Sequence, residues 1–315
     1  LVDKSPVSSF FQTRECYDFY TSLSFLKPFV FGISENEKLV GLLCGYIMAD
    51  GGRVKQFFSR RAIVPGGVLL DSTISENALQ KLLNFTIKSL KNEVIYIEMR
   101  NYLDYSDFRS VFEKSGYCYQ RHLNFHVQTQ SAETVYKQLS STKRRDIKVS
   151  EKAGAETVEL TTNAEIEKYY AILKNLYKTR IKLPLFPIEF FTKFIHLKEN
   201  KIWGIKYNGK IIGGSVCTYW NNVVYEWFVC GKDGHFKNVY PSSLATWSSI
   251  LYAANNGYQY VDMMGAGKVG EYYGVREFKA KFGGELVEYG RFLCICHKLL
   301  YRIGKFYIEK IKKIC

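Results

Sequence analysis

The sequence predicts an α/β protein made of two related units, each a mixed β-sheet flanked by helices, with an amphipathic helix at the C-terminus. Three observations predict this class. A hairpin-like segment occurs twice, the same order of elements follows both copies, and the end of the chain repeats apolar residues at helical spacing. A chain of 315 residues with 47% hydrophobic content is long enough for two domains.

The repeated segment begins at Phe29 (FVFGISENEKLVGLLCGYI) and again at Lys201 (KIWGIKYNGKIIGGSVCTYW). Each copy has two strand-like runs around a turn at Asn followed by Glu or Gly, so each predicts a β-hairpin. The identities hold at one constant offset without a gap. They pair Gly32 with Gly204, Ile33 with Ile205, Asn36 with Asn208, Lys38 with Lys210 and Gly41 with Gly213.

The same order of elements follows both hairpins. An extended run (VKQFFSRRAIV and NVVYEWFVC) precedes a helical pattern (ENALQKLLNFTIKSL and SLATWSSILYAAN), and a strand around Tyr96 or Tyr260 comes next. The closing segments FEKSGYCYQRHLNF and KAKFGGELVEYGRF place Gly116 opposite Gly283 and Phe125 opposite Phe292. We therefore expect a first unit at 1–135, a second at 136–293 and a C-terminal helix at 294–315.

The expected C-terminal helix, HKLLYRIGKFYIEKIKKIC, has one apolar and one basic side. This composition suits a helix lying at a membrane interface, and it equally suits a terminal helix docked on the protein with a solvated basic face. The apolar side holds Leu299, Leu300, Ile303, Phe306, Tyr307, Ile311 and Ile314, and the basic side holds Lys298, Arg302, Lys305, Lys312 and Lys313.

Charge narrows the classes of partner. The net charge of +14 favours polyanions, whether nucleic acid, phosphorylated small molecules or anionic lipid headgroups. The apolar runs are broken before the roughly 20 residues that a spanning helix needs, and we expect no secretory signal. The eight cysteines lack metal-binding spacing, as do the histidines, so we expect buried thiols in a reducing compartment and no metal site.

Three stretches resemble the Fem family, whose members have two tandem acetyltransferase-like (GNAT-like) units. They are STKRRDIKVSEKAG at 141–154, YPSSLATWSSILYAANNGYQYVDMMGAG at 240–267, and YYGVREFKAKFGGELVEYGRF at 272–292. The resemblance implies an aminoacyltransferase that takes an amino acid from aminoacyl-tRNA, as co-substrate rather than bound cofactor. The acceptor would be an amine of a peptidoglycan precursor or related envelope intermediate. It also implies a cytoplasmic protein, with contact to the inner face of the membrane if the C-terminal helix binds there.

Lys279 is the first candidate catalytic residue. Read as a helix, GVREFKAKFGG aligns Val275, Phe278 and Phe282 on one stripe, and Lys279 falls along it. The first copy has an uninterrupted apolar stripe here, which points to the second unit as the working one. A preorganised cation facing a developing oxyanion contributes about 3 kcal/mol to acyl transfer. The alternative is a lysine that extends from the helix edge to solvent.

Phe278 and Lys281 flank this lysine. The resemblance places the Phe-Lys pair at the reactive end of the donor, where Phe278 could stack on the terminal adenosine, a contact of about 1–3 kcal/mol per base. Plain core packing is the alternative for Phe278. Lys281 stands at the i,i+4 position from Glu277, so it forms either an exposed ion pair or a phosphate contact.

Three further residues complete the candidate site. Asp262 ends a strand, where ligands of open sheets bind, and could orient or deprotonate the attacking amine. Since Glu98 holds the matching place in the first copy, a structural carboxylate is the alternative. The resemblance implies that Arg144 binds phosphate of the acceptor; the alternative is that Arg144 belongs to a solvated basic turn, Lys143-Arg144-Arg145. Tyr225 is a candidate for lining the acceptor channel.

Two other functions stay open. An acyl-coenzyme A-dependent N-acyltransferase of envelope or exopolysaccharide synthesis is one, although GKDGHFKNVYPSS lacks the glycine spacing of a pyrophosphate-binding loop. A non-catalytic protein that binds RNA or a membrane surface is the other.

Overall fold

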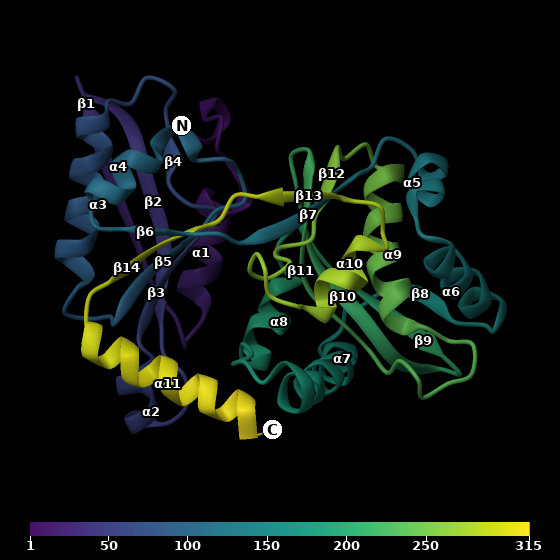
Figure 1. The fold of residues 1–315 in the computed structure, drawn as a ribbon. Helices are drawn as coiled ribbons and strands as arrows, with labels where there is room; N and C mark the ends of the chain where they lie inside the picture. The colour runs from purple at the N-terminus through teal and green to yellow at the C-terminus, as the bar shows by residue number, and fades with distance from the viewer. Residues whose placement is uncertain (315) are drawn as a thin grey trace. The chain divides into compact units, whose positions relative to one another are not determined.

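The computed structural model describes residues 1–314, and the side chains of 1–306. The chain forms two compact units, Leu1–His122 together with Tyr289–Cys315, and Leu123–Glu288. Each contains a mixed sheet flanked by helices (Figure 1), so the expected fold class is confirmed.

The sheet of the first unit has the order β1-β2-β3-β5-β14-β6, with β4 paired to β2. Its one parallel pair joins β3 to β5, and the crossover between them contains α3. The strands are β1 (Lys27–Glu35), β2 (Lys38–Met48), β3 (Arg61–Pro65), β4 (Leu69–Leu70), β5 (Tyr96–Arg100), β6 (Cys118–Gln120) and β14 (Arg291–Ile295). The helices are α1 (Arg14–Ser22), α2 (Arg53–Ser59), α3 (Glu76–Leu90), α4 (Arg109–Lys114) and α11 (Lys298–Ile314), with 3-10 turns at Val2–Lys4, Phe10–Gln12 and Ser106–Phe108.

The second sheet has the order β13-β7-β12-β11-β10-β9-β8 and again one parallel pair, β11 with β12, joined through α9. The strands are β7 (Leu123–Gln128), β8 (Glu156–Glu159), β9 (Asn200–Tyr207), β10 (Lys210–Trp220), β11 (Val223–Gly231), β12 (Tyr260–Asp262) and β13 (Glu285–Glu288). The helices are α5 (Ala132–Gln138), α6 (Ser141–Lys152), α7 (Asn163–Leu176), α8 (Ile188–Phe194), α9 (Pro241–Asn255) and α10 (Gly274–Ala280), with a π-helical turn at Tyr177–Ile181.

Both predicted hairpins form. Glu35 pairs with Lys38 and Tyr207 pairs with Lys210, so each loop has two residues. Both loop residues have positive φ in each copy, 49° and 64° in the first and 49° and 72° in the second. This backbone matches the twist of the strands, and it explains the Asn at the first loop position, since Asn tolerates the left-handed region.

The last strand of each sequence copy pairs in the sheet of the other unit. β7, which ends the first copy, lies between β13 and β12, and β14, which ends the second copy, lies between β5 and β6. The unit limits therefore fall at 122/123 and 288/289, and differ from the expected limits at 135/136 and 293/294. The two closing strands have similar apolar sequences, so the pattern alone does not say which sheet each completes.

A second difference concerns VKQFFS, which was expected to be extended but forms α2; the strand begins only at Arg61. The loop that contains α2 is closed at its base by Arg61, whose two terminal nitrogens lie 2.7 and 3.1 Å from the carboxylate oxygens of Asp50. Ser59 Oγ also accepts a hydrogen bond from Asp50 N (2.8 Å). These contacts hold the two ends of the loop together, and α2 forms in the loop between them.

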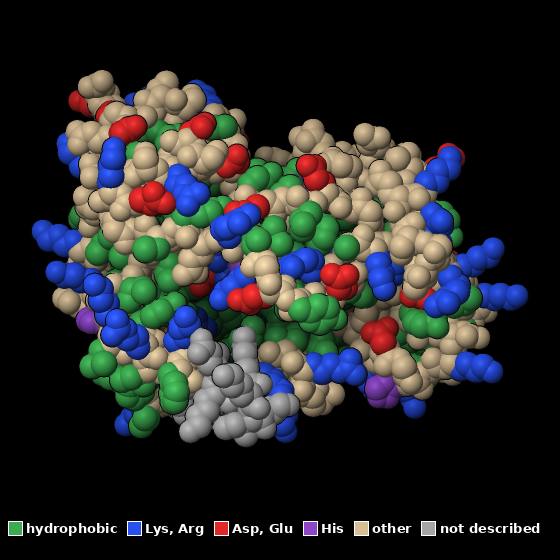
Figure 2. Space-filling model, in the orientation of Figure 1, with side chains coloured by type: hydrophobic (Ala, Val, Ile, Leu, Met, Phe, Trp, Pro, Cys, Tyr) green, Lys and Arg blue, Asp and Glu red, His purple; other side chains and the backbone are tan. Residues whose placement is uncertain are grey.

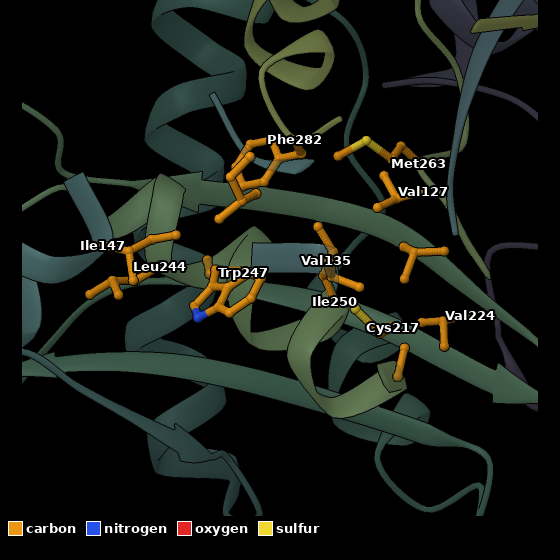
Figure 3. Packing of buried hydrophobic residues seen from close by; sticks show 14 of the residues in the cluster. Val127, Val135, Ile147, Cys217, Val224, Leu244, Trp247, Ile250, Met263 and Phe282 are labelled. Atoms are coloured by element: carbon orange, nitrogen blue, oxygen red, sulfur yellow. The ribbon is translucent and has the colours of Figure 1, made fainter. Parts of the chain in front are cut away.

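The core of the second unit lies between its sheet and α9. Figure 3 shows side chains of the sheet (Val127, Cys217, Val224) packed with those of α9 (Leu244, Trp247, Ile250). Phe282, which follows α10, is fully buried in the same cluster. This packing attaches the segment that carries Lys279 to the end of the sheet. Within the described part of the chain, no helix is long and apolar enough to cross a membrane.

Candidate active site

The site begins where β11 and β12 part. The two strands pair only from Val223 to Tyr225 and from Tyr260 to Asp262, after which β11 continues to Gly231 while β12 ends. The chain leaves β12 through Met264, Gly265 and Gly267, with φ values of 52°, 114° and 80°. This left-handed turn directs backbone carbonyls toward α10.

The side chain of Lys279 contacts this turn. Its Nζ donates hydrogen bonds to the carbonyl oxygens of Met263 and Gly265, the latter at 2.7 Å. The side chain is half-buried and bends onto the turn rather than extending to solvent. Burial lowers the pKa of Lys279, and the negative charges of Glu226 and Asp262 oppose that shift. An ammonium has three N–H donors, and the hydrogen bonds to Met263 and Gly265 use two of them.

Glu226, which was not among the residues predicted from the sequence, is a buried carboxylate that faces this charge. It follows Tyr225 on β11, is 3% exposed, and accepts a hydrogen bond from Ser249 Oγ of α9 (3.1 Å). Burial raises the pKa of Glu226, while the Lys279 ammonium and the Ser249 hydroxyl oppose the shift. A charged residue inside the apolar run YEWFVC was the available signal, because such a group is buried only with a partner.

Asp262 is fully buried and has partners on both carboxylate oxygens. Oδ1 accepts from Asn124 Nδ2 and from Met264 N, both at 2.6 Å, and Oδ2 lies 3.2 Å from His126 Nε2. Asn124 Oδ1 in turn accepts from Gly265 N (2.7 Å). These bonds hold the turn that presents its carbonyls to Lys279, which supports the structural alternative for Asp262.

Phe278 lies half-buried against the core and contacts Lys143, the first residue of the basic run Lys143-Arg144-Arg145. Lys143 Nζ is 4.0 Å from the ring centroid of Phe278 and donates to Ser243 Oγ at 2.6 Å. Lys143 is 5% exposed. Burial lowers its pKa to about 8, with Asp146 and Asp233 opposing the shift and Lys281 adding to it. One face of the Phe278 ring is thus covered by a cation.

Arg144 does not share this site. Its Nη1 donates to the carbonyl oxygens of Lys137 (2.9 Å) and Leu139 (2.8 Å), which satisfies the C-terminal end of α5. Arg145 pairs instead with Asp146 at 3.0 Å. The basic run therefore divides into one inward lysine, one helix-capping arginine and one exposed arginine.

Tyr225 and Lys281 lie at the margins. Tyr225 is 2% exposed and belongs to the sheet interior. Lys281 is exposed, and its backbone oxygen accepts from Ser140 N (2.9 Å). The expected ion pair with Glu277 does not form among the described residues. Nor is any group of three or more His, Cys, Asp or Glu side chains placed to hold a metal ion in the part of the chain described.

Residues 196–309 match the model of the FemAB family, which confirms the resemblance to the Fem family. A comparison with curated proteins gives no match. Among solved structures, a crystal structure of FemX aligns with a TM-score of 0.70 and 12% identity over 96% of each chain.

Two further solved structures share the fold. The C-terminal domain of a putative lysylphosphatidylglycerol synthetase from Agrobacterium fabrum has a TM-score of 0.58 and 11% identity over 89% of this chain and 86% of that one. A tandem GNAT protein from the clavulanic acid biosynthesis pathway has a TM-score of 0.54 and 10% identity, over 87% and 85%. At these identities the likeness establishes the fold, a tandem pair of GNAT-like units, and together with the family match it supports an acyltransferase.

Proposed function

We propose that this protein transfers an amino acid from aminoacyl-tRNA to an amine of a peptidoglycan precursor or a related envelope intermediate. The observation that carries the proposal is the Lys279 ammonium, held by two turn carbonyls where β11 and β12 part, with Glu226 buried nearby. The FemAB match over the same segment supports it. Because aminoacyl-tRNA is a cytoplasmic donor, we place the reaction in the cytoplasm.

The chemistry is attack of a neutral amine on the ester carbonyl of the donor. The carbonyl oxygen gains negative charge, the C–N bond forms, and the ester C–O bond breaks, so that the proton lost by the amine ends on the tRNA hydroxyl. Lys279 can donate its remaining N–H to the developing oxyanion, a contribution of about 3 kcal/mol. The nearby carboxylate of Glu226 favours the charged form of Lys279 against the effect of burial.

The other candidate residues take supporting parts in this proposal. Asp262 positions the turn through Asn124 and Met264 N, since both of its oxygens already have partners. Phe278 offers the ring face opposite Lys143 for stacking on the terminal adenosine. Lys281, which is exposed beside this group, is the better phosphate contact, because Arg144 is engaged by α5. Tyr225 is buried in the sheet, so its part in this proposal is to support the acceptor channel from below.

An acyl-coenzyme A-dependent N-acyltransferase is the second candidate, favoured by the fold shared with the tandem GNAT protein. A pyrophosphate would be expected at the N-terminus of α9, the helix that follows β11. There Asp233 Oδ1 accepts from Ser242 N (3.2 Å), and Asp233 Oδ2 accepts from Ser242 Oγ. A carboxylate already occupying that helix end argues against a second anion, which is why aminoacyl-tRNA is preferred.

The two donors are distinguished by one experiment. The protein is incubated with a pool of radiolabelled aminoacyl-tRNA, and separately with labelled acetyl-coenzyme A, each with an envelope-precursor fraction as acceptor. We expect label to leave the tRNA and enter the acceptor in an amide bond. Transfer from coenzyme A alone would overturn the proposal, and transfer from neither would support a non-catalytic binding protein.

A further inference from the structure

Helix α2 of the first unit has no buried residue. Three of its seven residues are large and apolar, and Val54, Phe57 and Phe58 are 77%, 48% and 39% exposed. Exposed apolar side chains that cluster are uncommon on monomeric soluble proteins and mark interaction surfaces. The Asp50–Arg61 pair fixes the base of this loop, so α2 is presented on an anchored segment.

Helix α11 lies beside α2 in the same unit (Figure 1). A Cβ placed on Gly304 would be 3.3 Å from the backbone oxygen of Phe58, so glycine permits a close approach of the two helices. On α11, Leu299, Ile303 and Phe306 follow the i, i+4, i+7 spacing of one helix face. They are 72%, 45% and 66% exposed.

These two sets form one surface, which we call the α2–α11 surface: Val54, Phe57, Phe58, Leu299, Ile303 and Phe306. Figure 2 shows hydrophobic side chains gathered over α2 and the start of α11, with Lys and Arg side chains beside them. The inner side of α11 faces the sheet instead, since the Tyr301 ring packs edge-on against Tyr96 of β5 with centroids 5.5 Å apart.

Most of the charge in the two segments that form this surface is positive. Over Arg53–Ser59 and Lys298–Phe306 the sequence has no acidic residue, and its charged residues are Arg53, Lys55, Lys298, Arg302 and Lys305. Just beyond α2, the guanidinium of Arg60 lies 4.8 Å from the Phe57 ring centroid. Apolar side chains flanked by Lys and Arg complement the boundary between acyl chains and anionic headgroups, because the long basic side chains reach the phosphates while the apolar groups leave water.

We propose that the α2–α11 surface binds the surface of an anionic lipid bilayer. The apolar face enters the headgroup region and the basic residues contact lipid phosphates, so the protein lies on the membrane. This inference does not depend on acyl transfer, since every residue involved belongs to the first unit while Lys279 belongs to the second. Of the two alternatives for the C-terminal helix, the proposal takes the helix at a membrane interface over the docked helix with a solvated basic face. It adds α2 as a second contact with the membrane.

Flotation of the full-length protein with vesicles tests the proposal without donor or acceptor. One set of vesicles is phosphatidylcholine alone and the other contains phosphatidylglycerol as well. We expect binding to the anionic vesicles only, weakening as salt rises. The double variant Val54→Gln/Phe306→Gln should lose at least about tenfold in binding, because two exposed apolar groups no longer enter the bilayer. Arg302→Glu should weaken binding about fivefold or more.

Phe85→Gln is the matched control, because Phe85 is 53% exposed on α3 of the same unit and lies outside the surface. It should bind vesicles like the wild type. Thermal melting of each variant checks folding, which these exposed positions should preserve. Equal binding to both vesicle types, or anionic-vesicle binding unchanged in the Val54→Gln/Phe306→Gln protein, would overturn the proposal; the second result would mean that another part of the protein contacts the vesicles.

Discussion

The Nζ of Lys279 donates a hydrogen bond to the backbone oxygen of Gly265 at 2.7 Å, across the turn that ends β12. The same ammonium bonds to the oxygen of Met263. A lysine so held has a fixed position without its positive charge being neutralised by direct pairing, because carbonyl groups are neutral acceptors. This arrangement is what an oxyanion-binding cation needs, since its orientation is set before the substrate arrives.

Replacing Lys279 should therefore remove transfer activity. We expect Lys279→Met to lower the single-turnover rate of aminoacyl transfer by about 10²–10³-fold, the usual effect of losing one oxyanion donor. Methionine keeps most of the apolar stem, so the core near Phe282 should stay packed. Lys168→Met is the control, because that side chain is exposed on α7 of the same unit and has no part in the proposed site; its catalytic rate should stay near that of the wild type. A folded Lys279→Met protein with normal rate would refute the assignment.

Glu226→Gln tests the electrostatic partner of Lys279 by a nearly isosteric change. Because the negative charge of Glu226 raises the pKa of Lys279 against burial, its loss should lower that pKa further. The charged form then disappears at a lower pH. The high-pH limb of the pH–rate profile of kcat/KM should shift to lower pH, and Ser249→Ala, which keeps the carboxylate charge, should shift it much less. An unchanged limb would show that Glu226 does not act on the catalytic group.

Much of the fold follows from local sequence signals. The two hairpins were predicted because Asn tolerates the left-handed backbone of a two-residue loop, and the helix at 76–90 matches α3 at both ends. Helix α2 was missed because adjacent phenylalanines after a valine are typical of strands, while the Asp50–Arg61 pair that joins the two ends of its loop involves residues outside the segment. The placement of β7 and β14 could not be read from either segment, since long-range pairing decides it.

Only part of the site could be predicted from the sequence, because some of its contacts also join segments far apart in the chain. Lys279 was found because it interrupts an apolar stripe that is intact in the other copy. Lys143 was missed inside a run of three basic residues, although Lys143, Asp146, Ile147 and Ser150 share the buried face of α6 at i, i+3, i+4, i+7. That spacing was the available signal. The sequence around Asn124 has no such signal. Its partner Asp262 is far away in the sequence and comes close only because β7 pairs with β12.

Asn124→Ala should expose the positioning role of the Asp262 network. The variant removes one of the two hydrogen bonds to Asp262 Oδ1, leaving the one from Met264 N, and it removes the acceptor for Gly265 N. We expect the free energy of unfolding to fall by about 1–3 kcal/mol, and transfer to slow because the turn no longer holds Lys279.

Asn256→Ala, at the exposed end of α9, is the control. Urea unfolding and single-turnover transfer measure the two effects. An Asn124→Ala protein with the stability and the transfer rate of the wild type would contradict the positioning role.

The buried ammonium of Lys143 makes stability depend on pH in a defined direction. Burial lowers its pKa from 10.5 to about 8. Between these two values the unfolded chain holds the proton that the folded protein has released, so the unfolded state binds more protons and stability rises with pH. Below pH 8 both states are protonated, and the folded state carries the full cost of burying the charge.

Lys143→Met should abolish this dependence. The difference in unfolding free energy between wild type and variant should change by about 2 kcal/mol in favour of the wild type from pH 7 to pH 10. Taking the difference cancels the other groups that titrate in this range. Lys281→Ala should raise the pKa of Lys143, since Lys281 contributes to lowering it, and should move the rise to higher pH. Urea unfolding at several pH values measures both effects, and a difference that stays constant with pH would mean that Lys143 remains charged in the folded protein.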